Sequence, residues 1–408
     1  MSNPINSGDT AWILVCCSLV LLMTPALALF YGGMVRRKNV LSTLTLSYVF
    51  MALIGVQWVL YGYSLAFGES IGGLIGGLNF LGFNGVAAAP NPNYSKTIPH
   101  GLFAAFQMMF AVITPALITG AFVERVRFKS FLLFSLIWAT LVYDPLCHWV
   151  WGKGGWLGAL GALDFAGGTV VHIAAGFSAL AFALAIGPRK GFGKSPMEPH
   201  NIPLTVIGAG LLWVGWFGFN AGSALAANGV AVNALLTTNT SAATAGLVWM
   251  VLSWLDGRPS TLGLVTGMVA GLAAITPASG FVTPMAAMVV GAVAAPLCYY
   301  GIRFRDKRKW DESLDVWACH GLASTWGMFA TGLFATVEVN AAGANGLFYG
   351  NPGQLAVQLL AIGVTMAFCF GVTFLVAKLL DWSIGLRVTT VEEEVGLDIS
   401  AHGERAYS

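Results

Sequence analysis

The stretches GGTVVHIAAGFSALAFALAIG (167–187) and WACHGLASTWGMFATGLFATV (317–337) decide the fold of this 408-residue chain. Both are about as long as a membrane-crossing helix and contain no Asp, Glu, Lys or Arg. Each nevertheless holds one histidine, His172 in the first and His320 in the second. An ionisable side chain inside a membrane helix is costly and is usually kept for transport or proton transfer. We therefore expect these two imidazoles to form the functional centre.

The composition of the whole chain gives the same indication. Hydrophobic residues make up 57% of it and charged residues only 9%, against about 25% in soluble domains. We therefore predict an all-α integral membrane protein, with the lipid bilayer as its surroundings, and we do not expect an enzyme. The net charge of +2 gives no indication of nucleic-acid binding. The first residues lack the basic region of a cleavable signal peptide.

Eleven apolar runs are long enough to be spans. They are residues 11–33, 42–67, 98–122, 130–148, 167–187, 202–222, 231–255, 261–276, 280–302, 317–337 and 354–384. All of the 20 Lys and Arg except Lys96 and Lys153 fall in alternate loops or on the C-terminal side. The excess of positive charge on one side predicts an outside N-terminus and a cytoplasmic C-terminus in the cell (inner) membrane. That polarity requires an odd number of transmembrane helices, which supports eleven.

This count favours a 5+5 inverted pseudo-twofold repeat followed by one long C-terminal helix. The inverted halves would cover about 11–190 and 200–337, and the eleventh helix about 354–384. His172 and His320 then occupy equivalent spans, the fifth and the tenth, and transporter sites often lie where inverted repeats meet. We predict a transmembrane domain over 1–386 and a cytoplasmic tail over 387–408.

Aromatic side chains beside polar residues gather at span ends predicted to face outward. They occur in FQMMF, HWVWG and WFGFNAGS, and the residues are Phe106, Phe110, Trp151, Trp216, Phe219 and Ser223. A cation over an aromatic ring gains about 0.5–2 kcal/mol, so we predict an external cation site. An interfacial aromatic belt with core filling is the alternative. Asp and Glu are expected only at span ends and in loops, so a crossing cation would meet no buried carboxylate.

Asp164, in ALDFAGGTVVH (162–172), is expected at an outer span end. We favour a structural and electrostatic role for it, such as capping the next helix, over direct acceptance of a proton. A helical path from Asp164 would leave His172 near the outer face, whereas an extended path would carry it toward the midplane. The sequence leaves both open. The remaining histidines are expected to be polar boundary residues: His100, His148, His200 and His402.

Two interpretations of the histidine pair are open. His172 and His320 are either buried histidines that bond backbone carbonyls, or a facing pair that shares a proton, since neutral imidazole both donates and accepts. A bis-histidine haem protein is a third possibility in principle, but neither CxxCH nor a four-histidine bundle pattern occurs. The six cysteines show no metal-ligand spacing and are interpreted as small core residues. We expect no cofactor and no metal.

Several longer strings are similar to those of a known family. They are ALFYGGMVRRKN (28–39), WVLYGYSLAFG (58–68), GAFVERVRF (120–128), GALDFAGGTVVH (161–172), GFGKSPMEPHN (191–201), GWFGFNAGS (215–223), HG (320–321) and GLDISAHGERAY (396–407). On these motifs the chain resembles the ammonium transporter family over nearly its whole length. Its bacterial and archaeal branch looks more similar than the Rhesus-type branch.

The resemblance implies a homotrimer with one pore per subunit, conducting ammonium or ammonia. It implies an external recruitment site made by Phe106, Phe110, Trp151 and Ser223, above a gate of Phe110 and Phe219. It further implies that His172 and His320 form a twin-histidine pair beside Trp216, and that Asp164 is the acidic residue of the vestibule. In the tail it points to Gly396, Asp398, His402, Gly403 and Glu404, with a PII-type signal protein as the expected partner.

The expected mechanism is electrogenic uptake in which ammonium is deprotonated, ammonia crosses the pore and the proton is relayed separately. Two alternatives remain. One is an electroneutral ammonia gas channel of Rhesus type, and the other is an ammonium sensor that binds but barely conducts.

Overall fold

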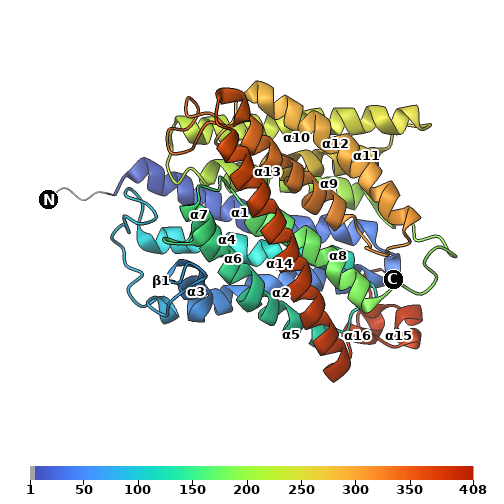
Figure 1. The fold of residues 1–408 in the computed structure, drawn as a ribbon. Helices are drawn as coiled ribbons and strands as arrows, with labels where there is room; N and C mark the ends of the chain where they lie inside the picture. The colour runs from blue at the N-terminus through green and yellow to red at the C-terminus, as the bar shows by residue number, and fades with distance from the viewer. Residues whose placement is uncertain (1–4, 408) are drawn as a thin grey trace.

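The structure is a computed structural model that describes residues 5–407. Most of these residues lie in a bundle of long helices (Figure 1). The α-helices are α1 (Ser7–Met34), α2 (Val40–Gln57), α3 (Tyr63–Phe67), α4 (His100–Ile118), α5 (Phe128–Trp138), α6 (Asp144–Trp151), α7 (Trp156–Ala159), α8 (Ala174–Ile186), α9 (Ile202–Gly222), α10 (Gly229–Leu255), α11 (Thr261–Ile275), α12 (Pro284–Lys307), α13 (Ala323–Phe334), α14 (Pro352–Ile384), α15 (Thr390–Val395) and α16 (Leu397–His402).

Within the described residues, four short π-helical segments interrupt the spans. They are η2 (Trp58–Gly62), η5 (Ala139–Tyr143), η6 (Gly168–Ile173) and η7 (Trp317–Leu322). The short 3₁₀ turns are η1 (Arg37–Asn39), η3 (Leu81–Phe83), η4 (Thr119–Ala121) and η8 (Leu347–Tyr349), and β1 (Ser70–Ile71) pairs antiparallel with β2 (Ile75–Gly76). Single π turns are frequent at functional sites, and here η6 carries His172 while η7 carries His320.

Each of the eleven predicted spans coincides with helix in the structure. Within residues 5–407, nine helical segments are long and apolar enough to cross a membrane. The other two predicted spans are shorter helices: α11, with 15 residues, and η7 followed directly by α13. Helices suit these apolar runs because lipid offers no hydrogen bonds and a helix satisfies its own backbone.

The fourth predicted span extends further than expected. It was expected over 130–148, but α5, η5 and α6 follow one another without a break over 128–151. Asp144 therefore lies in the interior of the segment and is 0% exposed. The expectation that every Asp and Glu sits at a span end or in a loop is wrong for Asp144, because the apolar residues after His148 prolong the helix.

Polar side chains fix where many of the long helices begin. The side chain at the N-cap accepts a hydrogen bond from a backbone N–H of the first turn, which would otherwise be unsatisfied. The residues that do so are Asn6 for α1, Asn201 for α9, Asn228 for α10, Ser260 for α11 and Thr283 for α12.

A contact between two glycines brings the two histidine-bearing segments together. A Cβ atom added to Gly176 would lie 2.3 Å from the Cα atom of Gly321, closer than any real contact. Gly176 is in α8, just after η6, and Gly321 is in η7. Only residues without a side chain allow this approach of two backbones in a membrane bundle. The spacing of His172 and His320 therefore depends on this pair.

The arrangement of the ends agrees with an odd number of crossings. In Figure 1, α1 begins at the left of the bundle, whereas α15 and α16 lie at the lower right. The long helix α14 crosses the face of the bundle and leads into these two short helices (Figure 1). The C-terminal helices therefore lie at the end of the bundle opposite the start of α1.

Candidate functional site

His172 and His320 face each other in the interior of the bundle. Their Nδ1 atoms are 3.2 Å apart, and their ring planes are inclined by only 16°. The rings are 1% and 3% exposed. Because a neutral imidazole carries one N–H, one ring must donate in this contact while the other accepts. The Nε2 atom of His172 has no hydrogen-bond partner in the described part of the chain.

The lumen beside the pair is narrow and apolar. Its lining residues are Met23, Leu27, Phe30, Ile113, Leu117, Val171, His172, Leu212, Trp216, Phe219, Val269 and His320. The space open to the centre of a water-sized sphere is about 10 Å³, which is room for about one water. A porphyrin between the imidazoles does not fit this geometry, which removes the haem interpretation.

Trp216 forms one wall of the lumen. Its ring stacks on His172 with centroids 5.2 Å apart and planes inclined by 21°. The indole Nε1 donates to Thr276 Oγ1 at 2.8 Å, so the ring orientation is set from outside the lumen. The local pattern grouped Trp216 with the aromatic residues at the outer ends. The family resemblance placed it beside the histidine pair, and that is where it lies.

Two phenylalanine rings close the lumen on one side. Phe110, from α4, and Phe219, from α9, have ring centroids 4.2 Å apart. The Phe219 ring is also 5.8 Å from that of His172. Thr114 Oγ1 donates to the Phe110 carbonyl and Ser223 Oγ donates to the Phe219 carbonyl. The two rings lie between the histidine pair and a wider cavity.

A wide cavity lies on the other side of these rings, and we call it the aromatic mouth. It measures about 560 Å³, and among the residues that line it are Tyr94, Gln107, Phe110, Trp151 and Ser223. Phe110 and Trp151 meet edge to face, with ring centroids 5.9 Å apart. The structure thus brings three of the four predicted recruitment residues to one cavity.

Phe106 differs from its prediction. It is fully buried and does not line the aromatic mouth. It packs edge-on against Phe110 with ring centroids 5.0 Å apart. Phe106 and Phe110 are one turn apart in α4, and this spacing alone does not show which of the two rings lines the cavity. Phe106 supports the ring of Phe110 from behind.

Asp164 holds the start of the segment that carries His172. Its Oδ1 accepts from the backbone N–H groups of Gly167 at 2.8 Å and Gly168 at 2.6 Å. Its Oδ2 accepts from the N–H of Thr169 at 2.7 Å, from the Thr169 hydroxyl, and from Val170 N–H at 3.4 Å. The chain is non-helical up to Gly167, whose φ is +116°, and η6 begins immediately after it. The path from Asp164 to His172 is therefore neither one continuous helix nor extended, because a bend over 165–166 leads directly into η6.

The same residue orders the aromatic mouth. The Trp151 indole Nε1 donates to the Asp164 backbone carbonyl at 2.9 Å. Both oxygens of the Asp164 carboxylate accept hydrogen bonds at the N-terminus of η6, so the side chain caps this helix. Its negative charge is also favourable at a helix N-terminus, beside the aromatic mouth. This geometry supports the structural role that we favoured over proton acceptance.

Further space lies past His320, toward the charged end of the bundle. A second small cavity, also about 10 Å³, shares Phe30, Val269 and His320 with the lumen and ends at Asp315. Asp315 has a φ of +63°, which is unusual for a residue other than glycine. We call this end the charged mouth. Two narrow cavities with common walls therefore lie between the phenylalanine pair and Asp315.

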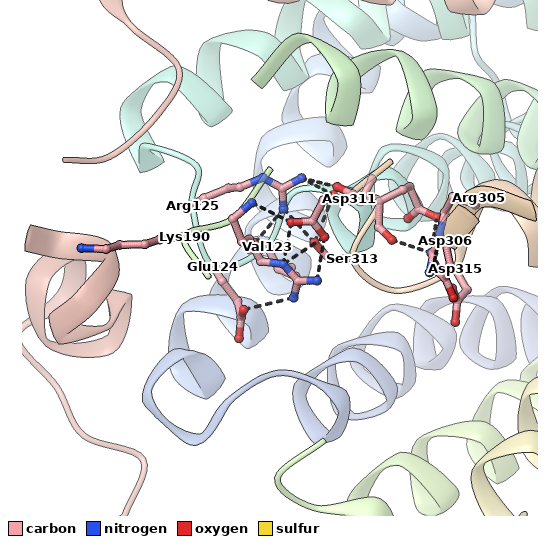
Figure 2. A network of polar contacts seen from close by, with 12 residues as sticks. Val123, Glu124, Arg125, Lys190, Arg305, Asp306, Asp311, Ser313 and Asp315 are labelled. Atoms are coloured by element: carbon pink, nitrogen blue, oxygen red, sulfur yellow. Dashed lines mark hydrogen bonds and ion pairs between the residues drawn. The ribbon is translucent and has the colours of Figure 1, made fainter. Parts of the chain in front are cut away.

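Ion pairs surround the charged mouth (Figure 2). Arg189 pairs with Asp311 at 2.7 Å and with Glu124 at 3.1 Å. Arg125 is 0% exposed and donates to Ser313 Oγ at 2.7 Å and to the carbonyl of Asp311 at 2.5 Å. These contacts join the loop after η4 to the loop between α12 and η7. The network fixes the loop that precedes His320.

Glu312 connects this network to the histidine segment. Its Oε1 accepts from Val316 N–H at 3.1 Å and its Oε2 from Trp317 N–H at 3.4 Å, at the start of η7. Arg305 lies 3.4 Å from Oε2. Burial raises the pKa of Glu312 to about 7; the Arg305 charge opposes this rise and the Asp315 charge adds to it.

Replacing Glu312 by Gln is expected to change how stability depends on pH. The ordinary pKa of this carboxyl is 4.5, so between pH 4.5 and about 7 the folded protein holds a proton that the unfolded chain has released. This contribution is fully present below pH 4.5 and is lost as the pH rises through about 7. Its full size is on the order of 3 kcal/mol. Thermal unfolding of wild type and Glu312→Gln in detergent should show the variant gaining relative stability across that window; parallel curves would contradict the prediction.

The C-terminal tail packs on the charged mouth. Asp398 Oδ1 accepts from Ser42 N–H at 2.8 Å, at the start of α2. Gly396 has a φ of +105°, and a Cβ there would lie 2.6 Å from Lys38 Cβ. The predicted tail residues Gly396 and Asp398 therefore meet the α1–α2 loop directly.

The three other predicted tail residues lie next to this contact. The His402 ring is 5.3 Å from that of Phe128. Gly403 ends α16 with a φ of +69°, and Glu404 N–H donates to the Asp398 carbonyl at 3.0 Å. The tail is thus anchored to the transmembrane bundle at several points.

Two of the other histidines lie near helix ends, as expected of boundary residues, but both are buried. His100 and His148 are 4% and 0% exposed. His100 Nε2 contacts the Tyr63 hydroxyl, and His148 Nδ1 donates to the Ala66 carbonyl at 2.9 Å. Both are satisfied structural side chains, because the loops after α3 fold back over them.

Sequence reasoning missed three residues of the site. Gln107 lines the aromatic mouth, and its buried Oε1 has no partner within residues 5–407. It lies in FQMMF, the string whose two phenylalanines were predicted to belong to the external cation site. Thr276 orients Trp216, and Glu312 caps η7. Neither of these two carried a local signal, because each acts on a residue distant in the sequence.

The fold and the cavities define a class: a multi-pass membrane protein with a narrow apolar lumen inside one helical bundle. The sequence profile of the Ammonium Transporter Family matches residues 11–407. The chain belongs to the ammonium transporter family. It is 53% identical over 404 residues to ammonium transporter Amt1 of Archaeoglobus fulgidus, covering 99% of this chain and 100% of that one. It is 52% identical over 408 residues to the ammonium transporter of Bacillus subtilis, covering 99% of each.

Solved structures show the same fold. The crystal structure of Candida albicans Mep2 superposes with a TM-score of 0.89 at 37% identity, covering 95% of this chain and 88% of that one. A structure described as a sensor Amt protein gives a TM-score of 0.91 at 31% identity, covering 98% of this chain and 100% of that one.

Proposed function

We propose that this protein is an ammonium transporter that takes up ammonium by deprotonating it. In this proposal the ion binds at the aromatic mouth, ammonia crosses the lumen, and the proton is relayed separately through His172 and His320. The observation that carries it is the direct contact of the two Nδ1 atoms, 3.2 Å apart, in a lumen with room for about one water.

The aromatic mouth suits a small cation with N–H donors. Phe110 and Trp151 present ring faces and edges, and a cation over a ring gains about 0.5–2 kcal/mol. Ser223 already donates its proton to the Phe219 carbonyl, so its oxygen lone pairs are free to accept from ammonium. Gln107 lines the same cavity, and its amide oxygen, turned toward the ion, would provide a second acceptor. Recruitment is therefore assigned to Phe110, Trp151, Ser223 and Gln107.

The lumen is unsuitable for an intact ion. Its walls are apolar apart from the imidazoles, and moving an ion into such surroundings costs several kcal/mol even after relaxation. A few aromatic rings cannot offset this cost. Loss of the proton removes the charge, and neutral ammonia then passes the Phe110–Phe219 gate and the lumen at a much lower cost. Deprotonation is thus placed at the gate.

The histidine pair is the proton path. Each imidazole can accept a proton at one nitrogen and release one at the other, and the two rings already share a hydrogen bond. The unpartnered Nε2 of His172 is the entry point in this scheme. The proton and ammonia recombine after His320, toward Asp315 at the charged mouth.

Charge movement in proteoliposomes tests this proposal. A jump in ammonium concentration should give a transient current in the wild type, and His172→Ala should reduce it by about 10²-fold or more, the usual contribution of a positioned proton-transfer group. Ammonium uptake without any current would support the electroneutral gas channel of Rhesus type. Binding with neither uptake nor current would support the sensor, the role named for one solved structure with this fold.

The position in the cell follows from the same proposal. We place the protein in the cell inner membrane as a homotrimer with one pore per subunit, with the aromatic mouth outside and the charged mouth in the cytoplasm. The transmembrane domain covers 1–386 and the cytoplasmic tail 387–408. The excess of Lys and Arg in the loops at the charged mouth supports this orientation.

The tail is proposed to be the docking element for a PII-type signal protein that covers the charged mouth. The anchoring of Gly396 and Asp398 beside the α1–α2 loop supports this, since a partner there would contact tail and pore loops together. Immobilised wild type should retain a PII-type protein, whereas a chain lacking residues 386–408 should not. Equal retention by both would contradict the docking role, and unchanged oligomeric state of the truncated chain is the control.

A further inference from the structure

The segment Phe128–Ala159 contains a carboxyl group that the transport scheme does not use. Asp144 is the first residue of α6 and is 0% exposed. It lines neither the aromatic mouth, nor the lumen, nor the cavity at Asp315. An ionised carboxylate at such a place is strongly unfavourable unless a cation or several hydrogen bonds compensate for its lost hydration. The surroundings of Asp144 therefore decide its charge state.

Those surroundings provide one donor and no cation. Gln57, the last residue of α2, donates from Nε2 to Asp144 Oδ2 at 2.8 Å. None of the ion pairs found within residues 5–407 includes Asp144. Tyr143 and Cys147, in the same segment, interact with Asp144, but neither can neutralise a negative charge.

The same two side chains also leave two acceptors unsatisfied. Asp144 Oδ1 and Gln57 Oε1 are both buried without a hydrogen-bond partner in the described part of the chain. The contacting pair thus has two acceptor oxygens and no hydrogen atom that either of them could accept. A protonated carboxyl provides that atom, because it has one O–H donor besides its remaining acceptor.

We propose that Asp144 is a proton-binding site within the membrane, where its neutral carboxylic acid forms a cyclic pair with the Gln57 amide. The Gln57 N–H donates to Oδ2, and the Asp144 O–H at Oδ1 donates to Gln57 Oε1. The pair joins α2 to α6 without placing a charge among the helices. The proton is held there and is not part of the transport path.

The backbone around the pair is adapted to it. A Cβ atom on Gly62 would lie 2.5 Å from Gln57 Oε1 and 2.7 Å from its Nε2, so the amide lies flat against this glycine. Gln57 immediately precedes the π-helical segment η2, and Asp144 immediately follows η5. Irregular turns thus flank both members of the pair, which is common where a helix positions a special group.

Infrared spectroscopy of the full-length protein in lipid tests the proposal. The difference spectrum between wild type and Asp144→Asn should show loss of a carboxylic acid C=O band, recorded above pH 7 so that Glu312 is ionised. Asp256→Asn is the matched control, since it removes an exposed carboxylate paired with Arg303 and should leave that band unchanged. Loss of a carboxylate band in Asp144→Asn would show an ionised Asp144 and overturn the proposal.

A second variant keeps the test independent of how well Asp144→Asn folds. Gln57→Leu removes the acceptor of the Asp144 O–H, so the same acid band should persist and move to higher frequency. An unmoved band would overturn the cyclic pair. Asp144→Asn, which mimics the neutral acid, should keep ammonium current within about twofold of wild type. A tenfold loss of current, about 1.4 kcal/mol, would overturn the claim that the proton stays outside the transport path.

Discussion

Replacing His320 by Glu, or His172 by Asp, is expected to let potassium cross a pore that excludes it in the wild type. Potassium and ammonium are similar in size, so a filter that recognises size or carbonyl contacts separates them poorly. A pore that requires loss of a proton excludes potassium because potassium has none to lose. A carboxylate in the lumen would provide the compensating charge that the apolar walls of this lumen lack.

The measurement is potassium-driven current in proteoliposomes, compared with ammonium-driven current in the same preparation. The selectivity for ammonium should fall by at least about tenfold, which corresponds to about 1.4 kcal/mol. His200→Gln is a suitable control, since His200 contacts Val35 and Tyr407 and does not line the lumen. If both histidine variants kept ammonium flux and potassium exclusion unchanged, the relay mechanism would be wrong.

Removing the Asp164 side chain should have the second-largest effect. Asp164→Ala leaves the buried N–H groups of Gly167, Gly168 and Thr169 without acceptors, and each unsatisfied group costs about 1–3 kcal/mol. The start of η6 then shifts, and the Nδ1–Nδ1 contact of the histidine pair with it. We expect a fall in ammonium current of about 10²-fold together with a lower melting temperature.

Asp164→Asn distinguishes capping from proton acceptance. Asn keeps one oxygen that can accept from Gly167 and Gly168, and asparagine is a good capping residue. It has no useful basicity, so a proton acceptor at this position would be lost. Current clearly above that of Asp164→Ala, with the melting temperature largely restored, fits the capping role. Equal loss of current in both variants, despite restored stability in Asp164→Asn, would favour proton acceptance instead.

Local sequence patterns were sufficient for the helices. Apolar runs of about 20 residues without charge have few alternatives in a membrane, so all eleven predicted spans coincide with helix. The fourth span runs to Trp151, a few residues past its expected end, because periodicity does not show where a buried helix stops once apolar residues continue past a histidine. The general expectation that Asp and Glu lie at span ends or in loops therefore failed for Asp144, which is buried inside the segment.

The sequence by itself determined the membrane class, the helical segments and the family, because lipid selects for length and polarity, and both are local properties. It also singled out His172 and His320, because an ionisable group in an apolar helix stands out without any partner in view. Only the tertiary structure decided that the two imidazole rings are in contact and that Phe106 packs against Phe110. It alone also showed that Glu312 caps η7 and that Thr276 orients Trp216. These facts depend on contacts between segments far apart in the chain, such as the meeting of Gly176 with Gly321, and no local pattern encodes such a distance.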